Sequence, residues 1–178
     1  MTSFSNIKYL VIDLETFSSV DLKKSGVYPY VEAPDFEILL AAISINGEEP
    51  IVYDLASGEK LPEEIINAMK DEKITKIAYN CNFERVCLSR YFGLQTGSYL
   101  SPRNWKDTIK SNGFRTRNLP KHDRHAWEIM KQYNKQDVIT ELAIENKFKV
   151  SPVPDSVWEE FYLDQEINDR GILVDMEL

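Results

Sequence analysis

The sequence has 178 residues, of which 43% are hydrophobic and 28% charged, and its net charge of −8 and balanced composition exclude a disordered, fibrous or disulfide-stapled chain. The two cysteines, Cys81 and Cys87, match no zinc-site spacing and favour a reducing compartment. The longest apolar run, Ile38–Ile45, is too short to cross a bilayer, and the N-terminus has no signal-peptide pattern, so we expect an intracellular soluble domain.

The first elements in chain order are strands. Ile7–Leu14 is apolar without polar alternation, which predicts a buried central strand. Glu37–Ile45 and Ile51–Leu55 also have the pattern of strands, and the short loop between them contains Gly47. This arrangement predicts an antiparallel hairpin.

From residue 62 onward, predicted helices and strands alternate. In chain order they are a helix at Pro62–Lys70, a strand at Lys76–Tyr79, a helix at Asn82–Phe92, a further candidate strand at Trp105–Thr108, a long helix at His125–Lys147 and a final helix at Ser156–Asp169. Asp123 is a good N-cap for the long helix, and Gly171 closes the last one. We therefore expect an α/β fold with a mixed sheet and helices on both faces.

The long predicted helix draws its apolar positions from spaced residues along its length. They are Trp127, Met130, Tyr133, Val138 and Leu142.

The charge is distributed unevenly along the chain. Residues 1–72 carry a net charge of −9, residues 73–150 carry +8 and residues 151–178 carry −7. Within the basic middle, residues 103–135 contain nine Lys or Arg against three acids. Such a segment could follow the phosphates of a nucleic acid, or could be an ordinary solvated loop. The overall negative charge therefore does not exclude nucleic acid as a partner.

Two carboxylates lie near the end of the first predicted strand. Asp13 and Glu15 are alternate residues, so they face the same side of the strand at a spacing of about 6.6 Å. Leu14 between them would point the opposite way, into the core. The pair could form part of a site, or could mark where a buried strand meets solvent.

Two further motifs place acids on helices. Asn80–Glu84 opens a helix, and Glu84 would lie near the positive end of the helix dipole. Tyr133 and Asp137 are four residues apart, hence on one helix face. In isolation, ordinary helix-start chemistry explains the first motif, and a core tyrosine with an exposed aspartate explains the second. The three motifs together are more discriminating than any one of them.

In this order, Asp-x-Glu, Asn-x-x-Phe-acid and Tyr-x-x-x-Asp resemble the DEDD superfamily of 3′–5′ exonucleases, which share a ribonuclease H-like fold. Tyr133, four residues before Asp137, resembles the tyrosine subtype; the histidine subtype has His one residue earlier, where this chain has Gln132. The segments NFERVCLSRYFG, LSPRNWKDT, NGFRTRNLPKHD and YNKQDV resemble the proofreading domain of phage-type family A (DNA polymerase I-like) DNA polymerases. The tail YLDQEINDRGILVD resembles the connection into their polymerase domain.

The resemblance implies a two-metal-ion exonuclease that releases nucleoside 5′-monophosphates from the 3′ end of single-stranded or frayed DNA. Two divalent ions, Mg²⁺ or Mn²⁺, would be held by the four acids, and carboxylate oxygens suit such ions. The implied ligands are Asp13, Glu15, Glu84 and Asp137. Tyr133 would orient the attacking water, because an ordinary tyrosine is too weak a base to deprotonate it.

The resemblance also implies DNA contacts and partners. The candidate contact residues are Thr16, Phe17, Asn80, Phe83, Arg115 and Arg117. Phe17 could stack on the terminal base or belong to the core, and the residues alone do not decide between these. The expected partners are a single-stranded DNA 3′ end and the polymerase domain of the same full-length chain, in the cytoplasm of a bacterial or phage-infected cell.

We expect residues 1–150 to form the exonuclease domain and residues 151–178 to begin the linker to a polymerase domain. Relative to the family, a lobe is missing near residues 109–112, and Glu84 stands where the family usually has Asp. These departures motivate an alternative to the active exonuclease, which is a catalytically impaired domain that binds DNA ends or scaffolds the polymerase. An RNA exonuclease on the same fold is a third hypothesis.

Overall fold

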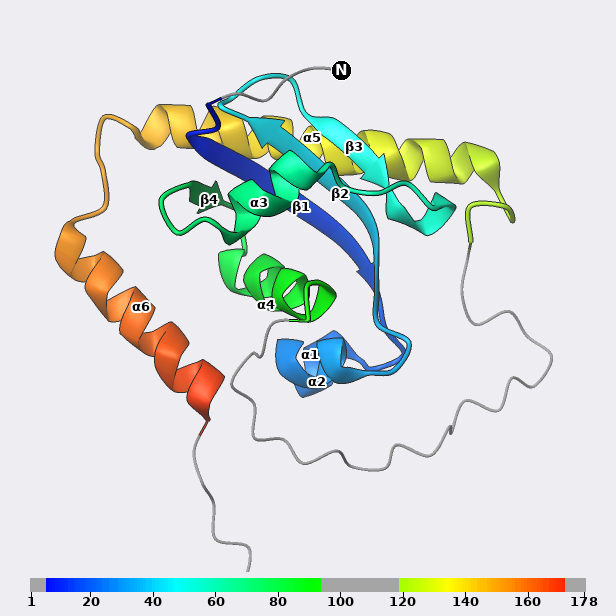
Figure 1. Ribbon diagram of the computed structural model, residues 1–178, viewed down its shortest axis with the longest axis horizontal. Coiled ribbons are helices and arrows are strands. Elements are labelled where there is room, and N and C mark those ends of the chain that lie inside the picture. Colours follow the sequence, from blue (N-terminus) through cyan, green and yellow to red (C-terminus); the bar gives the residue numbers. More distant parts are fainter. Residues whose placement is uncertain (1–5, 94–118, 172–178) are drawn as a thin grey trace, which may run out of the picture.

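The computed structural model describes residues 6–93 and 119–171, which contain a four-stranded mixed sheet in the order β3-β2-β1-β4 (Figure 1). The strands are β1 (Tyr9–Phe17), β2 (Glu37–Ile45), β3 (Ile51–Asp54) and β4 (Thr75–Ile77). β2 is antiparallel to β1 and to β3, whereas β4 is parallel to β1. The predicted mixed sheet of a ribonuclease H-like α/β fold is confirmed.

The antiparallel hairpin is formed as predicted. β2 has the predicted bounds, and the turn into β3 places Asn46 at φ 54° and Gly47 at φ 81°. Glycine is favoured at the second position, because other residues are strained at this positive φ and a Cβ there would also displace the hydroxyl of Tyr9, which would lie 2.6 Å away.

The first strand differs from its predicted bounds. It begins two residues later and runs on to Phe17, with a register shift between Glu15 and Thr16 where it pairs with β2. Asp13 and Glu15 therefore lie inside the strand rather than at its end. The partner strand causes the extension, because Phe17 pairs with Glu37 across the ladder.

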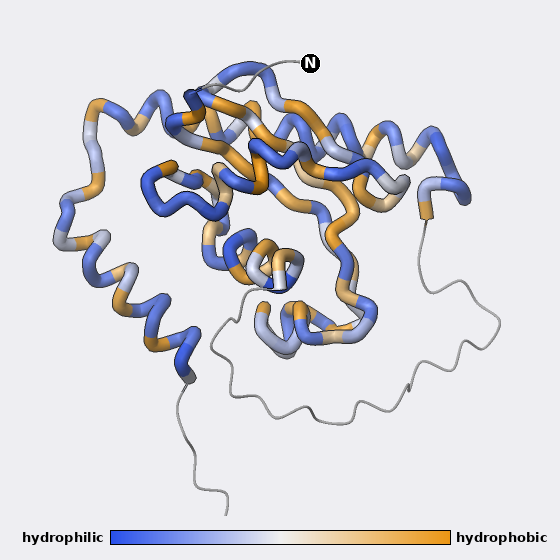
Figure 2. Tube along the Cα trace, in the orientation of Figure 1, coloured by the Kyte–Doolittle hydropathy of each residue, from blue (hydrophilic) through white to orange (hydrophobic). Residues whose placement is uncertain are grey.

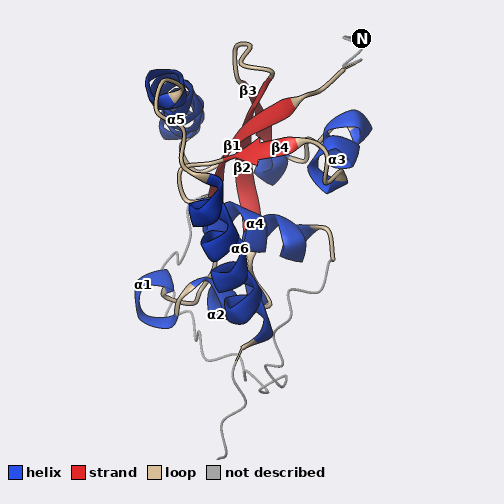
Figure 3. Ribbon diagram, turned by 90° about the vertical axis from the view of Figure 1, so that its left-hand side faces the viewer, coloured by secondary structure: helices blue, strands red, loops and turns tan. Residues whose placement is uncertain are grey.

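Helices cover both faces of the sheet, as predicted (Figure 3). On one face, the even-numbered residues Leu10, Ile12 and Leu14 of β1 belong to a core that includes residues of α3 (Glu63–Lys70) and α4 (Cys81–Tyr91). On the other, Val11 packs with Val138 of α5 (Arg124–Phe148). Figure 2 shows the apolar character of the two central strands between these helices. The alternation of β1 thus assigns Asp13 and Glu15 to the α5 face.

The caps of the long helix and of the last helix agree with the sequence. The side chain of Asp123 accepts a hydrogen bond of 2.9 Å from the N–H of Ala126 at the start of α5. α6 (Asp155–Arg170) ends at Gly171, whose φ is 69°. Among the apolar positions of α5, Tyr133 does not belong to the core, because its side chain is 58% exposed. The candidate strand Trp105–Thr108 and the region near residues 109–112 lie outside the described residues.

Three short helical segments were not predicted. They are α1 (Leu22–Ser25), α2 (Val27–Glu32) and the 3₁₀ turn η1 (Leu55–Ser57). Each is too short to show a helical period in the sequence. α1 and α2 lie between β1 and β2, beyond the carboxyl end of β1 (Figure 1). Within residues 6–93 and 119–171, no helix is long and apolar enough to cross a membrane.

Candidate active site

Three carboxylates converge where β1 passes α5. Asp13 and Glu15 extend from the same side of β1, and Asp137 comes from α5. Each contributes one carboxylate oxygen to a set in which all three atoms lie within 4.8 Å of one another, and all three side chains are half-buried. We call these residues the carboxylate cluster. The structure brings together three of the four metal ligands implied by the resemblance.

The negative charges in the carboxylate cluster repel one another. Burial, and then the negative charges of Asp13 and Asp137, raise the pKa of Glu15 to about 7. The pKa of Asp13 is also raised, by burial first and by the charge of Asp137, although a hydrogen bond from Asn134 partly offsets this. A divalent cation would relieve this repulsion, and the donors are all carboxylate oxygens, the ligands that Mg²⁺ and Mn²⁺ prefer. The cluster therefore fits such an ion.

Asn134 holds Asp13 in position. Its side chain is fully buried, and its Nδ2 donates hydrogen bonds to Oδ2 of Asp13 at 2.6 Å and to the backbone carbonyl of Asp13 at 3.2 Å. Sequence analysis missed this residue. The available signal was its place on the buried stripe of α5, seven residues after Trp127 and four before Val138, where an apolar side chain would be usual.

Glu84, the fourth implied ligand, is placed near the carboxylate cluster but is not a member of it. It lies in the first turn of α4 and is only 8% exposed. Burial, followed by the negative charges of Asp13 and Glu141, raises its pKa to about 8. Its Oε2 atom is buried and accepts no hydrogen bond from the part of the chain that the structure describes.

A further acid, Glu141, lies one helical turn after Asp137 and was not predicted. It is 9% exposed, and its Oε1 accepts a hydrogen bond of 2.9 Å from the backbone N–H of Tyr79. Burial, and then the charges of Asp13 and Asp137, raise its pKa to about 7, against the lowering effect of the Tyr79 hydrogen bond. Its spacing of four from Asp137 was the signal that could have suggested it.

Tyr133 stands at the exposed rim of the cluster. The negative charge of Asp137, and a hydrogen bond to that residue, raise the pKa of the phenol, with smaller effects from Glu15 and Asp13. The phenol therefore keeps its proton at neutral pH. This state allows it to donate a hydrogen bond and to orient a water molecule, but not to act as a strong base.

Two of the candidate DNA contacts are engaged inside the protein. The hydroxyl of Thr16 is hydrogen-bonded to the hydroxyl of Tyr30 at 2.9 Å. Phe17 is half-buried and packs on the core formed by Leu39, Leu40 and Trp127. Core packing therefore explains Phe17 without a bound base.

The other candidate contacts differ in exposure. Phe83 is half-buried, with its ring centroid 6.1 Å from that of Tyr30. Asn80 is exposed at the start of α4, and its side chain makes no capping hydrogen bond there. Arg115 and Arg117 lie outside the described residues.

Comparison with known proteins gives one informative relative. No family model matches the sequence, and no solved structure matches it. The chain is 39% identical to a DNA polymerase of Bacillus phage SP02, over an alignment that is 215 positions long. The alignment covers 97% of this chain but 33% of the phage protein, so the chain spans about a third of the length of this relative. The chain is therefore similar to one part of a larger phage DNA polymerase.

Proposed function

We propose that this protein is a two-metal-ion 3′–5′ exonuclease that removes nucleoside 5′-monophosphates from single-stranded or frayed DNA. The observation that carries the proposal is the convergence of Asp13, Glu15 and Asp137 within 4.8 Å on the α5 face of β1. A cluster of half-buried acids is unfavourable without a cation, and its oxygens suit Mg²⁺ or Mn²⁺.

In this proposal Asp13 contributes to both ion sites, and the other acids each contribute to one. Asp13, Glu15 and Asp137 would hold one ion, and Glu84, on α4, would help Asp13 to hold the second. When bound, two such ions stabilise the charge on the attacking and leaving oxygens of a phosphodiester displacement. Asn134 keeps the Asp13 carboxylate oriented, through its hydrogen bond of 2.6 Å. Tyr133, with its proton retained, orients the water that attacks the terminal phosphate.

The DNA would approach along the exposed side of this site. Asn80 is exposed beside Glu84, so its amide is available to a nucleotide. Thr16, Phe17 and Phe83 would shape the pocket for the terminal base from their half-buried positions. Arg115 and Arg117 would contact the phosphates of the DNA strand that precede the terminal nucleotide.

The relation to a phage DNA polymerase supports proofreading as the purpose of the reaction. The partner domain would be a polymerase domain of the same full-length chain, which hands over a mispaired 3′ end. We further propose that the polymerase is of family A and that the exonuclease is of the tyrosine subtype of the DEDD superfamily. The protein would act in the cytoplasm of a bacterial or phage-infected cell.

A 5′-labelled single-stranded oligonucleotide tests it. With Mg²⁺ or Mn²⁺, the protein should shorten the labelled oligonucleotide from its 3′ end in single-nucleotide steps, and EDTA should stop the reaction. Asp13→Asn should abolish shortening, whereas Glu64→Gln, which removes an exposed carboxylate on α3, should not. Intact DNA with the wild-type protein, or equal activity in Asp13→Asn, would contradict the proposal. A matched RNA oligonucleotide degraded faster than the DNA would contradict the assignment of the substrate.

A second function is favoured by one observation, the position of Glu84 outside the carboxylate cluster. If the longer Glu side chain cannot complete the second ion site, the domain would bind DNA ends without cutting them. Metal-dependent binding of a 3′ overhang with no shortening, together with shortening in Glu84→Asp, is the result that would favour this alternative.

A further inference from the structure

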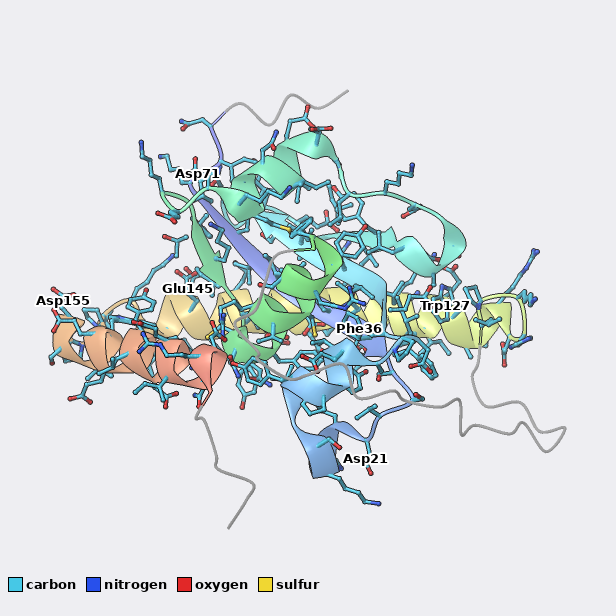
Figure 4. All side chains as sticks on the ribbon, turned by 60° about the horizontal axis from the view of Figure 1, so that its bottom comes forward. Asp21, Phe36, Asp71, Trp127, Glu145 and Asp155 are labelled. Carbon is cyan, nitrogen blue, oxygen red and sulfur yellow. The ribbon has the colours of Figure 1, made fainter. Side chains whose placement is uncertain are left out.

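Glu141 is a buried acid that the four-acid pattern does not include. It lies on α5 between Asp137 and Glu145, one turn from each. Figure 4 labels Trp127 and Glu145 toward opposite ends of this helix. One oxygen of Glu141 accepts the N–H of Tyr79 at 2.9 Å, and the other, Oε2, is buried without a hydrogen-bond partner among the described residues.

The Tyr79 hydrogen bond links two elements of the site. Tyr79 immediately precedes Asn80, the N-cap residue of α4, and Glu84 lies in the first turn of that helix. The side chain of Asn80 makes no capping hydrogen bond, so the start of α4 is not held by its own cap. Among the residues that the structure describes, the bond from Tyr79 to Glu141 is the hydrogen bond that ties α5 to this turn.

Burying Glu141 is costly for the fold. A carboxylate at 9% exposure with one unpaired oxygen is less favourable than an apolar side chain of similar size. The neighbouring charges of Asp13 and Asp137 add to this cost. A function in the neighbouring site would account for a buried acid at a position where it destabilises the fold.

We propose that Glu141 is a positioning residue that holds the start of α4 against α5, so that the side chain of Glu84 reaches Asp13. The proposal rests on the proposed exonuclease function, because it assigns Glu141 a role in the same site. Glu141 acts through the backbone of Tyr79 and is not itself a ligand. Its oxygen acceptor is needed, and its charge is not.

Two substitutions separate the acceptor from the charge. Glu141→Gln keeps an oxygen for the Tyr79 N–H and removes the charge, whereas Glu141→Leu removes both. Glu141→Leu should lower kcat by roughly 10–100-fold, the usual loss for an outer partner of a metal site, and change KM for the oligonucleotide little. Glu141→Gln should restore kcat. Glu145→Gln, one turn further along α5, is the matched control and should behave as wild type.

A second readout does not depend on activity. In the metal-free protein, the amide of Tyr79 should exchange slowly with solvent in wild type and Glu141→Gln, and faster in Glu141→Leu. Calorimetric titration with Mn²⁺ should show weaker binding at one site in Glu141→Leu alone. If Glu141→Leu does not fold by circular dichroism, Glu141→Ala takes its place in all three measurements.

Two results would overturn the inference. Loss of kcat in Glu141→Gln equal to that in Glu141→Leu would show that the charge matters and that Glu141 is a ligand. Unchanged kcat and unchanged Tyr79 exchange in Glu141→Leu would show that the bond positions nothing. Failure of the proposed function is distinguishable, because wild type would then neither cut DNA nor bind Mn²⁺, whatever the exchange of Tyr79.

Discussion

The two longest helices, α5 and α6, are attached to the protein in opposite ways. α5 buries Trp127, Asn134, Val138 and Glu141. α6 buries no residue at all, and its clearest attachment is the ion pair of Asp169 with Arg85 at 2.6 Å. The hydroxyl of Tyr28 also donates to Asp169 at 2.7 Å, on the same side chain.

The difference follows from what each helix carries. α5 supplies Asp137 and Asn134, which must stay within a few ångströms of Asp13 on β1, and close packing on a sheet provides that precision. α6 supplies no acid to the carboxylate cluster. A half-exposed ion pair is enough to dock it, and such pairs contribute little to stability.

The largest expected difference between the two helices is in catalysis. Asp137→Asn on α5 should reduce the proposed exonuclease activity by more than the roughly 100-fold that loss of an outer partner costs, because it removes a proposed oxygen ligand. Glu160→Gln on α6 removes an exposed acid and should leave the rate unchanged. Single-turnover cleavage of a labelled oligonucleotide measures both, and equal rates in the two variants would refute the division of roles.

The second difference concerns stability and uses the tryptophan that each helix contains. Trp127→Ala should lower the free energy of unfolding by about 3–5 kcal/mol, because the ring is 8% exposed and its Nε1 donates to Asp54 at 2.8 Å. Trp158→Ala on α6 should cost about 1 kcal/mol, since that ring is 44% exposed. Urea unfolding gives both values, and similar losses would contradict the contrast in packing.

The sequence predicted those parts of the fold that local patterns encode. The bounds of β2, the Gly47 turn and the Asp123 cap depend on neighbouring residues, and all three were predicted. Asn134 and Glu141 were missed, because a polar residue in a helical stripe reads as solvent-exposed until the sheet beside it is known. The distance of Glu84 from the carboxylate cluster depends on where α4 starts relative to β1, which no local pattern determines.

A third prediction concerns pH. The pKa of Glu84, ordinarily 4.5, is raised to about 8, so between these pH values the unfolded state ionises while the folded state keeps its proton. The metal-free protein should therefore lose stability as pH rises from about 4.5 to about 8, and Glu15, with a pKa of about 7, adds to the loss. Glu84→Gln should become more stable relative to wild type as pH rises through this range.

Chemical denaturation in EDTA at pH 5 and pH 8 measures this change. Millimolar Mn²⁺ at pH 8 should restore part of the lost stability of wild type, because a cation binds the ionised folded state. Stability curves of wild type and Glu84→Gln that run parallel across the pH range would contradict the assigned burial of Glu84.

The smallest expected effect is the release of α6. Arg85→Gln should change the free energy of unfolding by about 1 kcal/mol or less, yet allow proteases to cut within α6 faster. Arg170→Gln is the control, because its partner Glu166 lies on the same helix and the pair is exposed. Limited proteolysis followed by mass spectrometry locates the cuts. Cleavage within α6 that is equally fast in wild type and Arg85→Gln would show that the Arg85–Asp169 pair does not dock the helix.

Metal binding by the carboxylate cluster is the central claim, and calorimetric titration with Mn²⁺ tests it most directly. Wild type should bind two ions, and Asp13→Asn should lose both, because Asp13 interacts electrostatically with Asp137 and with Glu84 and is the acid that the two proposed ion sites share. Glu64→Gln should bind as wild type does. Absence of Mn²⁺ binding at millimolar concentration in wild type, or undiminished binding in Asp13→Asn, would contradict the account.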